Sequence, residues 1–222
     1  MSTSKRKKGI NWRYTFGEIA IVIVGITIAF SLNRWAENSQ DRKLRKQYTT
    51  SLITDLDTEI NQLESNIADF RDRLDAIDRI MPILYGAPGP RDSVPNTIYH
   101  LASGVSYNPQ DITYQTLVNT GDLSLFGSLD LQKRLQKHHA GQQELVKDYT
   151  RQDKINEKYM GEFMIREFDY SAIRQGKYDF IDQPILRNII QSLRGSYLIA
   201  ITESESFIER SKELKTYLQE EG

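Results

Sequence analysis

The chain has 222 residues, which is enough for one folded domain with an anchor but not for several independent domains. Its 29 basic and 30 acidic residues nearly cancel, so no overall field favours a nucleic-acid partner, and we expect none. The absence of cysteine excludes disulfides, thiolate catalysis and cysteine-ligated metal sites.

Residues 1–13 form a basic tail. They carry five positive charges and no acidic residue, directly before the only long apolar run in the chain. The charged residues are Lys5, Arg6, Lys7, Lys8 and Arg13. This order is typical of a chain that is directed to a membrane.

Residues 14–35 are predicted to form a transmembrane helix. The stretch 19–32 contains only two hydroxyl residues as polar members. A bilayer core needs roughly 20 helical residues, and the run supplies them if Glu18 is accepted near one end. Side chains suited to the membrane interface flank the run on both sides: Trp12, Arg13, Tyr14, Arg34 and Trp35.

Two other interpretations of this run remain. A signal peptide also has a basic start and a short apolar stretch, and Ala29-Phe30-Ser31 suits cleavage. A buried core helix would leave the basic tail and the aromatic flanks unexplained. No turn residue follows Trp35, which favours an anchor that continues into a stalk.

The distribution of Lys and Arg gives the expected orientation. Within fifteen residues of each end of the span there are five on either side, but four of the C-terminal five lie more than eight residues beyond Asn33. The tail is short and adds the amino terminus. We therefore expect a single-pass protein of the bacterial inner (cytoplasmic) membrane, with its N-terminus in the cytoplasm and its C-terminal domain in the periplasm.

Glu18, Gly25 and Ala29 are the candidate functional residues of the span. An ionisable group inside a bilayer commonly marks an ion path or a helix contact. Glu18 lies about 6 Å inside the boundary by helical rise, where it can instead pair with Arg13 or a lipid headgroup. Gly25 and Ala29 form a small-xxx-small pair that lets another helix approach closely. Glu18 and Gly25 fall on one face of the helix.

Several short runs stand out in and beside the span: Tyr14-Thr15-Phe16-Gly17-Glu18-Ile19, Gly25-Ile26 and Asn33-Arg34-Trp35-Ala36-Glu37-Asn38. A later stretch runs from Tyr114-Gln115-Thr116-Leu117 through Gly121-Asp122-Leu123. Together these runs resemble an uncharacterised bacterial family of small single-pass membrane proteins, a domain of unknown function. The resemblance covers most of the chain, implies a membrane location and supplies no activity.

Residues 36–85 are expected to continue the membrane helix as a stalk. Apolar residues recur at alternating steps of four and three, which is a heptad seam. The seam residues are Leu56, Ile60, Leu63, Ile67, Phe70, Leu74 and Ile77. Pro82 and the Pro/Gly-rich loop from residue 86 stop this helix.

Residues 86–222 are expected to form a helical bundle together with part of the stalk. Short helices are predicted over 96–103 and from Asp111 to Gly121, and a long helix from Ser128 to about Phe168, with a break near Gly141. Residues 169–183 suit a short extended piece. A final helix begins at Pro184. The fold class is thus all-α, an elongated up-and-down bundle.

The heptad seam allows two kinds of partner. The seam can be buried by the chain's own helices in a self-contained bundle, or it can pair with the same seam of a second copy as a homo-oligomer. The residues leave both alternatives open.

No residue pattern indicates catalysis, a cofactor or a metal. Adjacent histidines on a helix point about 100° apart, so His138 and His139 cannot both bind one metal ion unaided. No hydrolase, zinc-protease, Walker or dinucleotide motif is present. The Asp and Glu residues of the long helices are interpreted as a solvated face.

Three functional hypotheses follow. The first is a membrane-anchored helical interaction or scaffold protein, not an enzyme, in contact with the lipid bilayer and a protein partner. The second is a subunit of an ion-conducting or force-transducing membrane complex that uses Glu18. The third is a ligand-sensing helical bundle with a separate signalling partner.

Overall fold

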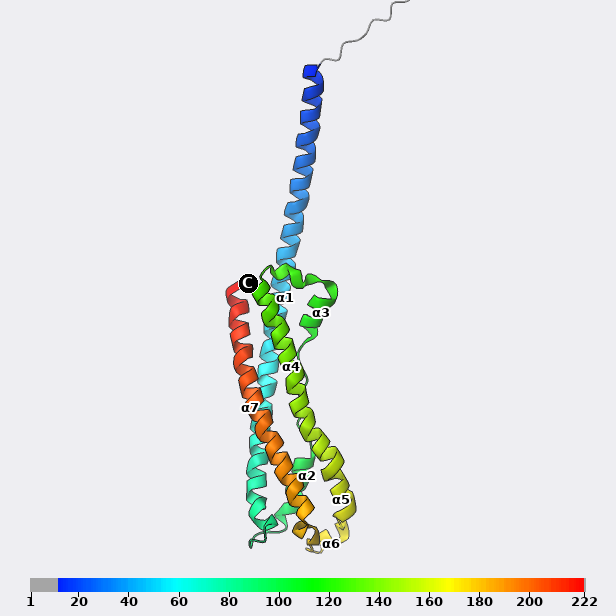
Figure 1. Cartoon of the computed structure of the whole chain (residues 1–222), viewed down its shortest axis with the longest axis vertical. Helices are drawn as coiled ribbons and strands as arrows, with labels where there is room; N and C mark the ends of the chain where they lie inside the picture. The colour runs from blue at the N-terminus through cyan, green and yellow to red at the C-terminus, as the bar shows by residue number, and fades with distance from the viewer. Residues whose placement is uncertain (1–11, 222) are drawn as a thin grey trace, which may run out of the picture. The chain divides into compact units, whose positions relative to one another are not determined.

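The computed structural model describes residues 12–221, and the side chains of residues 16–220. The fold is all-α, as predicted, and the described residues contain no strand (Figure 1). Most of the basic tail lies outside the described residues, and so do the side chains of Trp12, Arg13 and Tyr14.

The chain divides into two compact units, residues 1–47 and 48–222. Helix α1, Trp12–Leu84, contributes to both. Residues 48–84 of α1 are an integral part of the second unit, so most of the expected stalk belongs to the bundle. Helix α1 ends two residues after Pro82.

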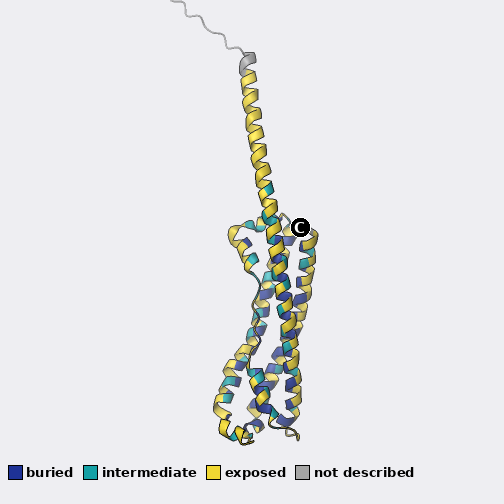
Figure 2. Cartoon of the chain, turned by 180° about the vertical axis from the view of Figure 1, so that it is seen from behind, coloured by how far each residue is buried: buried dark blue, intermediate teal, exposed yellow. Residues whose placement is uncertain are grey.

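Three long helical stretches build the second unit. Besides α1 they are α4 (Leu129–Ile155), which leads through the π-helical turn η2 (Asn156–Met160) into α5 (Gly161–Glu167), and α7 (Pro184–Glu221). In Figures 1 and 2 these stretches run side by side along the unit. Pro184 opens α7 as the sequence predicts, because its fixed φ suits the first helical position.

Shorter elements fill the remaining side of the bundle. Helix α2 (Ser93–Ala102) is followed by the irregular segment 103–111, by α3 (Ile112–Thr120) and by the 3-10 helix η1 (Asp122–Phe126). Gly121 ends α3 in the left-handed region at φ 79°. The hydroxyl of Ser128 accepts a hydrogen bond from the Leu131 amide, which confirms the predicted start of α4.

Two predicted features of the C-terminal half are wrong. Helix α4 is continuous at Gly141, and the disturbance comes at η2 instead. A π turn holds one residue more than an α turn, so it rotates the face that follows. Met160 is therefore buried, whereas Tyr159 is 48% exposed. Residues 169–183 hold helix α6 (Tyr170–Arg174) and the 3-10 helix η3 (Asp179–Asp182), not an extended piece.

The core of the second unit consists of two apolar clusters. One cluster gathers around Leu56, Phe126 and Leu135, and the other extends from Ile60 to the far end of the bundle. The heptad seam lies within them (Figure 2). Six seam residues are buried, and Leu74 is partly buried against the core. The chain's own helices cover this seam, so its pairing with a second copy would require the bundle to open.

Candidate functional site

The first candidate site is the apolar part of α1 in the first unit. Large apolar side chains are exposed all around the helix there, between 51% and 74% of each (Figure 2). They are Ile19, Ile21, Val22, Ile23, Val24, Ile26, Ile28, Phe30 and Leu32. Within the described residues, this is the one helix that is long and apolar enough to cross a membrane.

The few polar groups of this stretch are satisfied within the helix. The hydroxyl of Thr27 donates to the carbonyl of Ile23 at 2.8 Å, and the hydroxyl of Ser31 donates to the carbonyl of Thr27 at the same distance. Such bonds leave no hydroxyl proton without an acceptor in an apolar surrounding. Below the stretch, Asn33 donates to Glu37 at 2.7 Å.

The predicted site residues of the span are all exposed. Glu18, Gly25 and Ala29 lie on the helix surface, and a Cβ added at Gly25 would meet nothing within 4 Å. Arg34 and Trp35 are exposed at the end of the stretch. The described part of the chain places no second helix against this face.

The second candidate site is a buried polar layer between the two apolar clusters of the bundle. Its centre is Glu59 on α1, whose side chain is fully buried. Tyr107 donates its hydroxyl to Glu59 Oε1 at 2.5 Å, and the amide of Gln142 donates to the same oxygen at 2.9 Å. The other oxygen, Oε2, lies 3.0 Å from Nε2 of His138.

Three parts of the chain therefore meet at one carboxylate. Glu59 comes from α1, His138 and Gln142 come from α4, and Tyr107 comes from the segment 103–111. Burial and the neighbouring Glu59 carboxylate raise the pKa of Tyr107, so its hydroxyl remains a donor at neutral pH. Next to this layer, His139 stacks on Tyr114 with ring centroids 4.6 Å apart.

Buried polar side chains also hold the segment 100–106 in place. The guanidinium of Arg73, 4% exposed, donates to the carbonyls of His100 and Leu101. Asn156 donates to the Leu101 carbonyl at 3.0 Å, and Gln152 donates to the carbonyl of Val105. The irregular backbone has no helix or sheet partner here, so side chains take over its hydrogen bonding.

These buried groups were missed by sequence reasoning, which assigned the acidic residues of the long helices to a solvated face. Glu59 sits beside Ile60, and Arg73 follows the seam residue Phe70 by three positions. Both fall beside or near seam positions, but so does the exposed Glu64, and this position alone is therefore no signal. The partners of Glu59 come from 48 to 83 residues away, and the carbonyl partners of Arg73 from 27 and 28 residues away, so no signal for them was present in the sequence.

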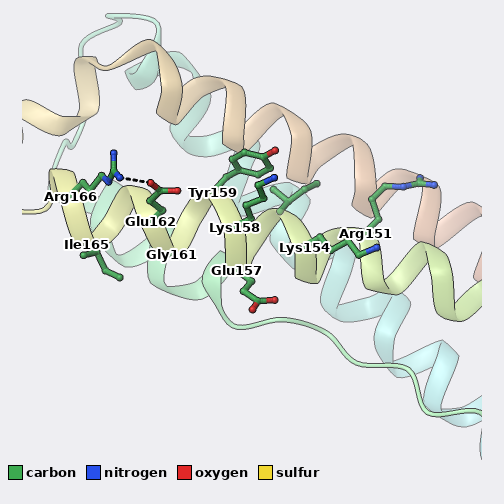
Figure 3. A pocket seen from close by; sticks show the side chains of 10 residues that line it. Arg151, Lys154, Glu157, Lys158, Tyr159, Gly161, Glu162, Ile165 and Arg166 are labelled. Atoms are coloured by element: carbon green, nitrogen blue, oxygen red, sulfur yellow. Dashed lines mark ion pairs between the residues drawn. The ribbon is translucent and has the colours of Figure 1, made fainter.

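A shallow groove of about 930 Å³ runs along α4, η2 and α5 (Figure 3). Ile165 is 82% exposed beside it. Two of its arginines are already paired, Arg166 with Glu162 at 2.8 Å and Arg151 with Asp148 at 3.2 Å. Its surface thus mixes apolar and paired charged groups, and no single ligand chemistry is indicated.

The histidines do not form a metal site. Within the described residues, no group of three metal-ligating side chains is close enough to hold an ion. His138 contacts Glu59, whereas His139 contacts Gln142 and Asp111. The two adjacent rings thus point to different partners, as the helical geometry predicts.

Comparison of the chain with protein-family models, with curated proteins and with solved structures found no match. The resemblance to a family of single-pass membrane proteins therefore stays a prediction.

Proposed function

We propose that this protein is a single-pass membrane-anchored interaction or scaffold module. In this proposal the apolar stretch of α1 spans a bacterial inner membrane and the helical bundle contacts a protein partner. The proposal assigns no catalytic reaction and no cofactor to the chain.

The exposure of the apolar stretch carries the proposal. Nine large apolar side chains in fourteen residues lie outside any core of the chain. Burial of an apolar side chain of this size is worth roughly 1.5–3 kcal/mol, so full exposure of nine to water would be costly. A bilayer supplies the missing apolar surrounding, and the helix satisfies its own backbone and hydroxyl groups as a span must.

The second unit supports a role in interaction because it closes its own core. The heptad seam is buried by the chain's own helices. In this proposal the bundle is therefore stable without a second copy. Its outer surface remains free for a partner. The side of the membrane follows from the charge argument alone, which favours a cytoplasmic tail and a periplasmic bundle.

A cysteine-labelling experiment tests the span and its orientation, since the chain has no native cysteine. Three single variants are made in the full chain: Ser4→Cys in the tail, Ile23→Cys in the apolar stretch and Ala87→Cys in the exposed loop after α1. A membrane-impermeant maleimide is added to cells whose outer membrane is permeabilised, to lysed cells and to protein in denaturing detergent. Ile23 is 58% exposed in the chain itself, so its protection must come from outside the chain.

The expected pattern is labelling of Ala87→Cys in cells whose outer membrane is permeabilised, labelling of Ser4→Cys only after lysis, and labelling of Ile23→Cys only in denaturing detergent. If Ile23→Cys reacts in lysed cells as fast as Ala87→Cys, the stretch lies in water and the anchor proposal fails. Reaction of Ala87→Cys only after lysis would place the bundle in the cytoplasm and overturn the orientation.

A further inference from the structure

A small groove between α4 and α7 is lined by cationic side chains. Its volume is about 90 Å³. From α4 come Arg134, Lys137 and His138, and from α7 come Phe207, Arg210, Glu213 and Leu214. Lys137 and His138 lie three and four positions after Arg134, so Arg134 is a surface neighbour of both.

Two of the three cations in this groove have no carboxylate partner among the described residues. Arg134 is paired with Asp130 at 2.7 Å and covers the ring of Tyr217. Arg210 donates to the hydroxyl of Ser206 at 3.0 Å, and its guanidinium lies 5.6 Å from the ring centroid of Phe207. Lys137 forms no ion pair within the described part of the chain. The groove thus presents an unbalanced positive charge, with Glu213 as the only acidic residue in its lining.

His138 links this groove to the buried carboxylate behind it. Its Nε2 faces Glu59, whereas its Nδ1 has no hydrogen-bond partner within the described residues. The ring lies 4.8 Å from the ring of Phe207, centroid to centroid, which fixes its position at the groove. The side chain is 13% exposed, so a small ligand can reach it from the groove.

Nδ1 is the ring nitrogen of His138 that is left for a ligand, because Nε2 is engaged with Glu59. A ring nitrogen of histidine that carries the proton is a hydrogen-bond donor, and an anion is met by this form. His138 can therefore offer a donor to an anion in the groove.

We propose that this groove binds a phosphate group, held by Lys137, Arg210 and the Nδ1–H of His138. Lys137 and His138 come from α4 and Arg210 comes from α7. A phosphate group carries a charge of about −1.5 to −2 at neutral pH, which matches two unpaired cations better than the single charge of a carboxylate. The space lies below the roughly 300 Å³ of typical small-molecule sites, so it suits a free phosphate or the terminal phosphate of a larger molecule.

This inference is independent of the membrane anchor, so its test does not share a failure with the labelling experiment above. The full chain in a neutral detergent is titrated with inorganic phosphate at constant ionic strength, with chloride as the exchanged ion. Binding is measured by calorimetry and, in parallel, by the nitrogen-15 signals of histidine side chains. The matched control titration uses acetate.

Two double variants of equal charge change give the comparison. Lys137→Glu with Arg210→Glu alters the groove, and Lys154→Glu with Lys158→Glu alters exposed lysines along the other face of α4 and η2. All four side chains are exposed, so both variants retain the core. We expect saturable phosphate binding that weakens at least about tenfold in the first variant and is unchanged in the second, since only the first removes charge-assisted hydrogen bonds to the phosphate.

Phosphate should also shift the Nδ1 signal of His138 in the unaltered chain, and acetate should do so less. The proposal is overturned if phosphate gives no saturable effect beyond chloride, or if both double variants lose binding equally. Equal loss would mean a general response of a basic surface. An unchanged Nδ1 signal at saturation would likewise remove His138 from the site and with it the proposed geometry.

The phosphate can be free or part of a lipid headgroup, and a second arm separates these sources. The chain is placed in nanodiscs of phosphatidylcholine or in nanodiscs that also contain phosphatidic acid. If headgroups occupy the groove, added phosphate binds in the first kind of disc but not in the second. If the ligand is free in solution, the affinity is the same in both.

Discussion

Glu59 Oε2 and His138 Nε2 lie 3.0 Å apart, although 79 residues separate them in the chain. The pair joins α1 to α4 in the layer where the two apolar clusters of the bundle meet. Because both groups are buried or nearly so, the pair fixes how these two helices are aligned, and any other alignment would leave a carboxylate unpartnered in the core.

Removal of this carboxylate should cost far more than its neutralisation. Glu59→Ala leaves Tyr107, Gln142 and His138 without their shared acceptor, and we expect the free energy of unfolding to fall by about 3–5 kcal/mol. Glu59→Gln keeps an acceptor for Tyr107, and its amide can donate to His138. The free energy of unfolding should therefore fall much less in this variant. Chemical denaturation of the full chain in detergent, followed by circular dichroism, compares the two. Equal losses would contradict a hydrogen-bonded role for this layer.

The same substitution at two glycines should have opposite effects. A Cβ at Gly141 would lie 2.9 Å from Cε2 of Phe207, a fully packed ring, so Gly141→Ala should destabilise the bundle by about 1–3 kcal/mol through overpacking. At Gly195 a Cβ meets nothing within 4 Å. Gly195→Ala should therefore stabilise the helix by up to about 1 kcal/mol. Thermal unfolding measures both, and a stabilising Gly141→Ala would show that α4 and α7 are less tightly packed here.

The sequence predicted the helices themselves well because their signals are local. The helix starts at Asp111, Ser128 and Pro184 and the helix end at Gly121 depend on residues within one turn, and each lies where it was expected. The side chain of Asp111, however, accepts no capping hydrogen bond, and the amide of Thr113 donates instead to Asp55 of α1 at 3.4 Å. The apolar periodicity likewise placed the seam residues in the core. Gly141 misled the prediction, because a helical glycine breaks a helix in one setting and admits a neighbouring ring in another.

The candidate sites could be predicted only in part. The apolar stretch is contiguous in the sequence, so its residues could be named in advance. The layer around Glu59 depends on contacts across the bundle, and nothing within one turn of Glu59 distinguishes it from an exposed glutamate such as Glu64. The groove at Lys137 and Arg210 joins two helices whose register the sequence does not specify.

Buried tyrosines should make the bundle sensitive to alkaline pH. Burial raises the pKa of Tyr107, Tyr149 and Tyr197 above the value near 10 of an unfolded chain. Below about pH 10 both states are protonated and these groups do not affect stability. Above it the unfolded state loses protons that the folded state keeps, so unfolding becomes more favourable by about 1.4 kcal/mol per pH unit and tyrosine.

This sign is checked by denaturation at a series of alkaline pH values, with tyrosinate absorbance recorded in parallel. The late-ionising tyrosines should titrate together with unfolding. Tyr197→Phe removes one of the three groups, together with the contacts of its hydroxyl to the Leu101 carbonyl at 3.5 Å and to Arg73 and Asn156. The slope of stability against pH should decrease in this variant. An identical slope would mean that Tyr197 ionises in the folded state.

Arg73 should prove irreplaceable by lysine, unlike its exposed neighbour Arg71. A lysine at position 73 cannot serve Asp69 and the carbonyls of His100 and Leu101 at once, so Arg73→Lys should cost about 1.5–3 kcal/mol. Arg71 pairs with Glu205 in solvent, and Arg71→Lys should cost less than about 1 kcal/mol. Amide exchange of residues 103–111 should accelerate only in the first variant. Equal exchange in both would show that the segment is held by its apolar residues alone.

Gly25 tests whether the span meets another helix. A side chain at this position contacts nothing in the chain itself, so Gly25→Ile should leave the bundle's unfolding unchanged. If the small residues Gly25 and Ala29 form a close-approach face, the larger side chain should reduce crosslinking of the protein in membranes, to another copy or to a partner. Ala20→Ile is the matched control, since position 20 lies about 140° away around the helix. A loss of crosslinks in Gly25→Ile but not in Ala20→Ile assigns the contact to this face. An equal yield of crosslinks in the two variants would mean that the span acts only as an anchor. Glu18, which lies on the same side as Gly25, would then be expected to pair at the membrane interface and not with another helix.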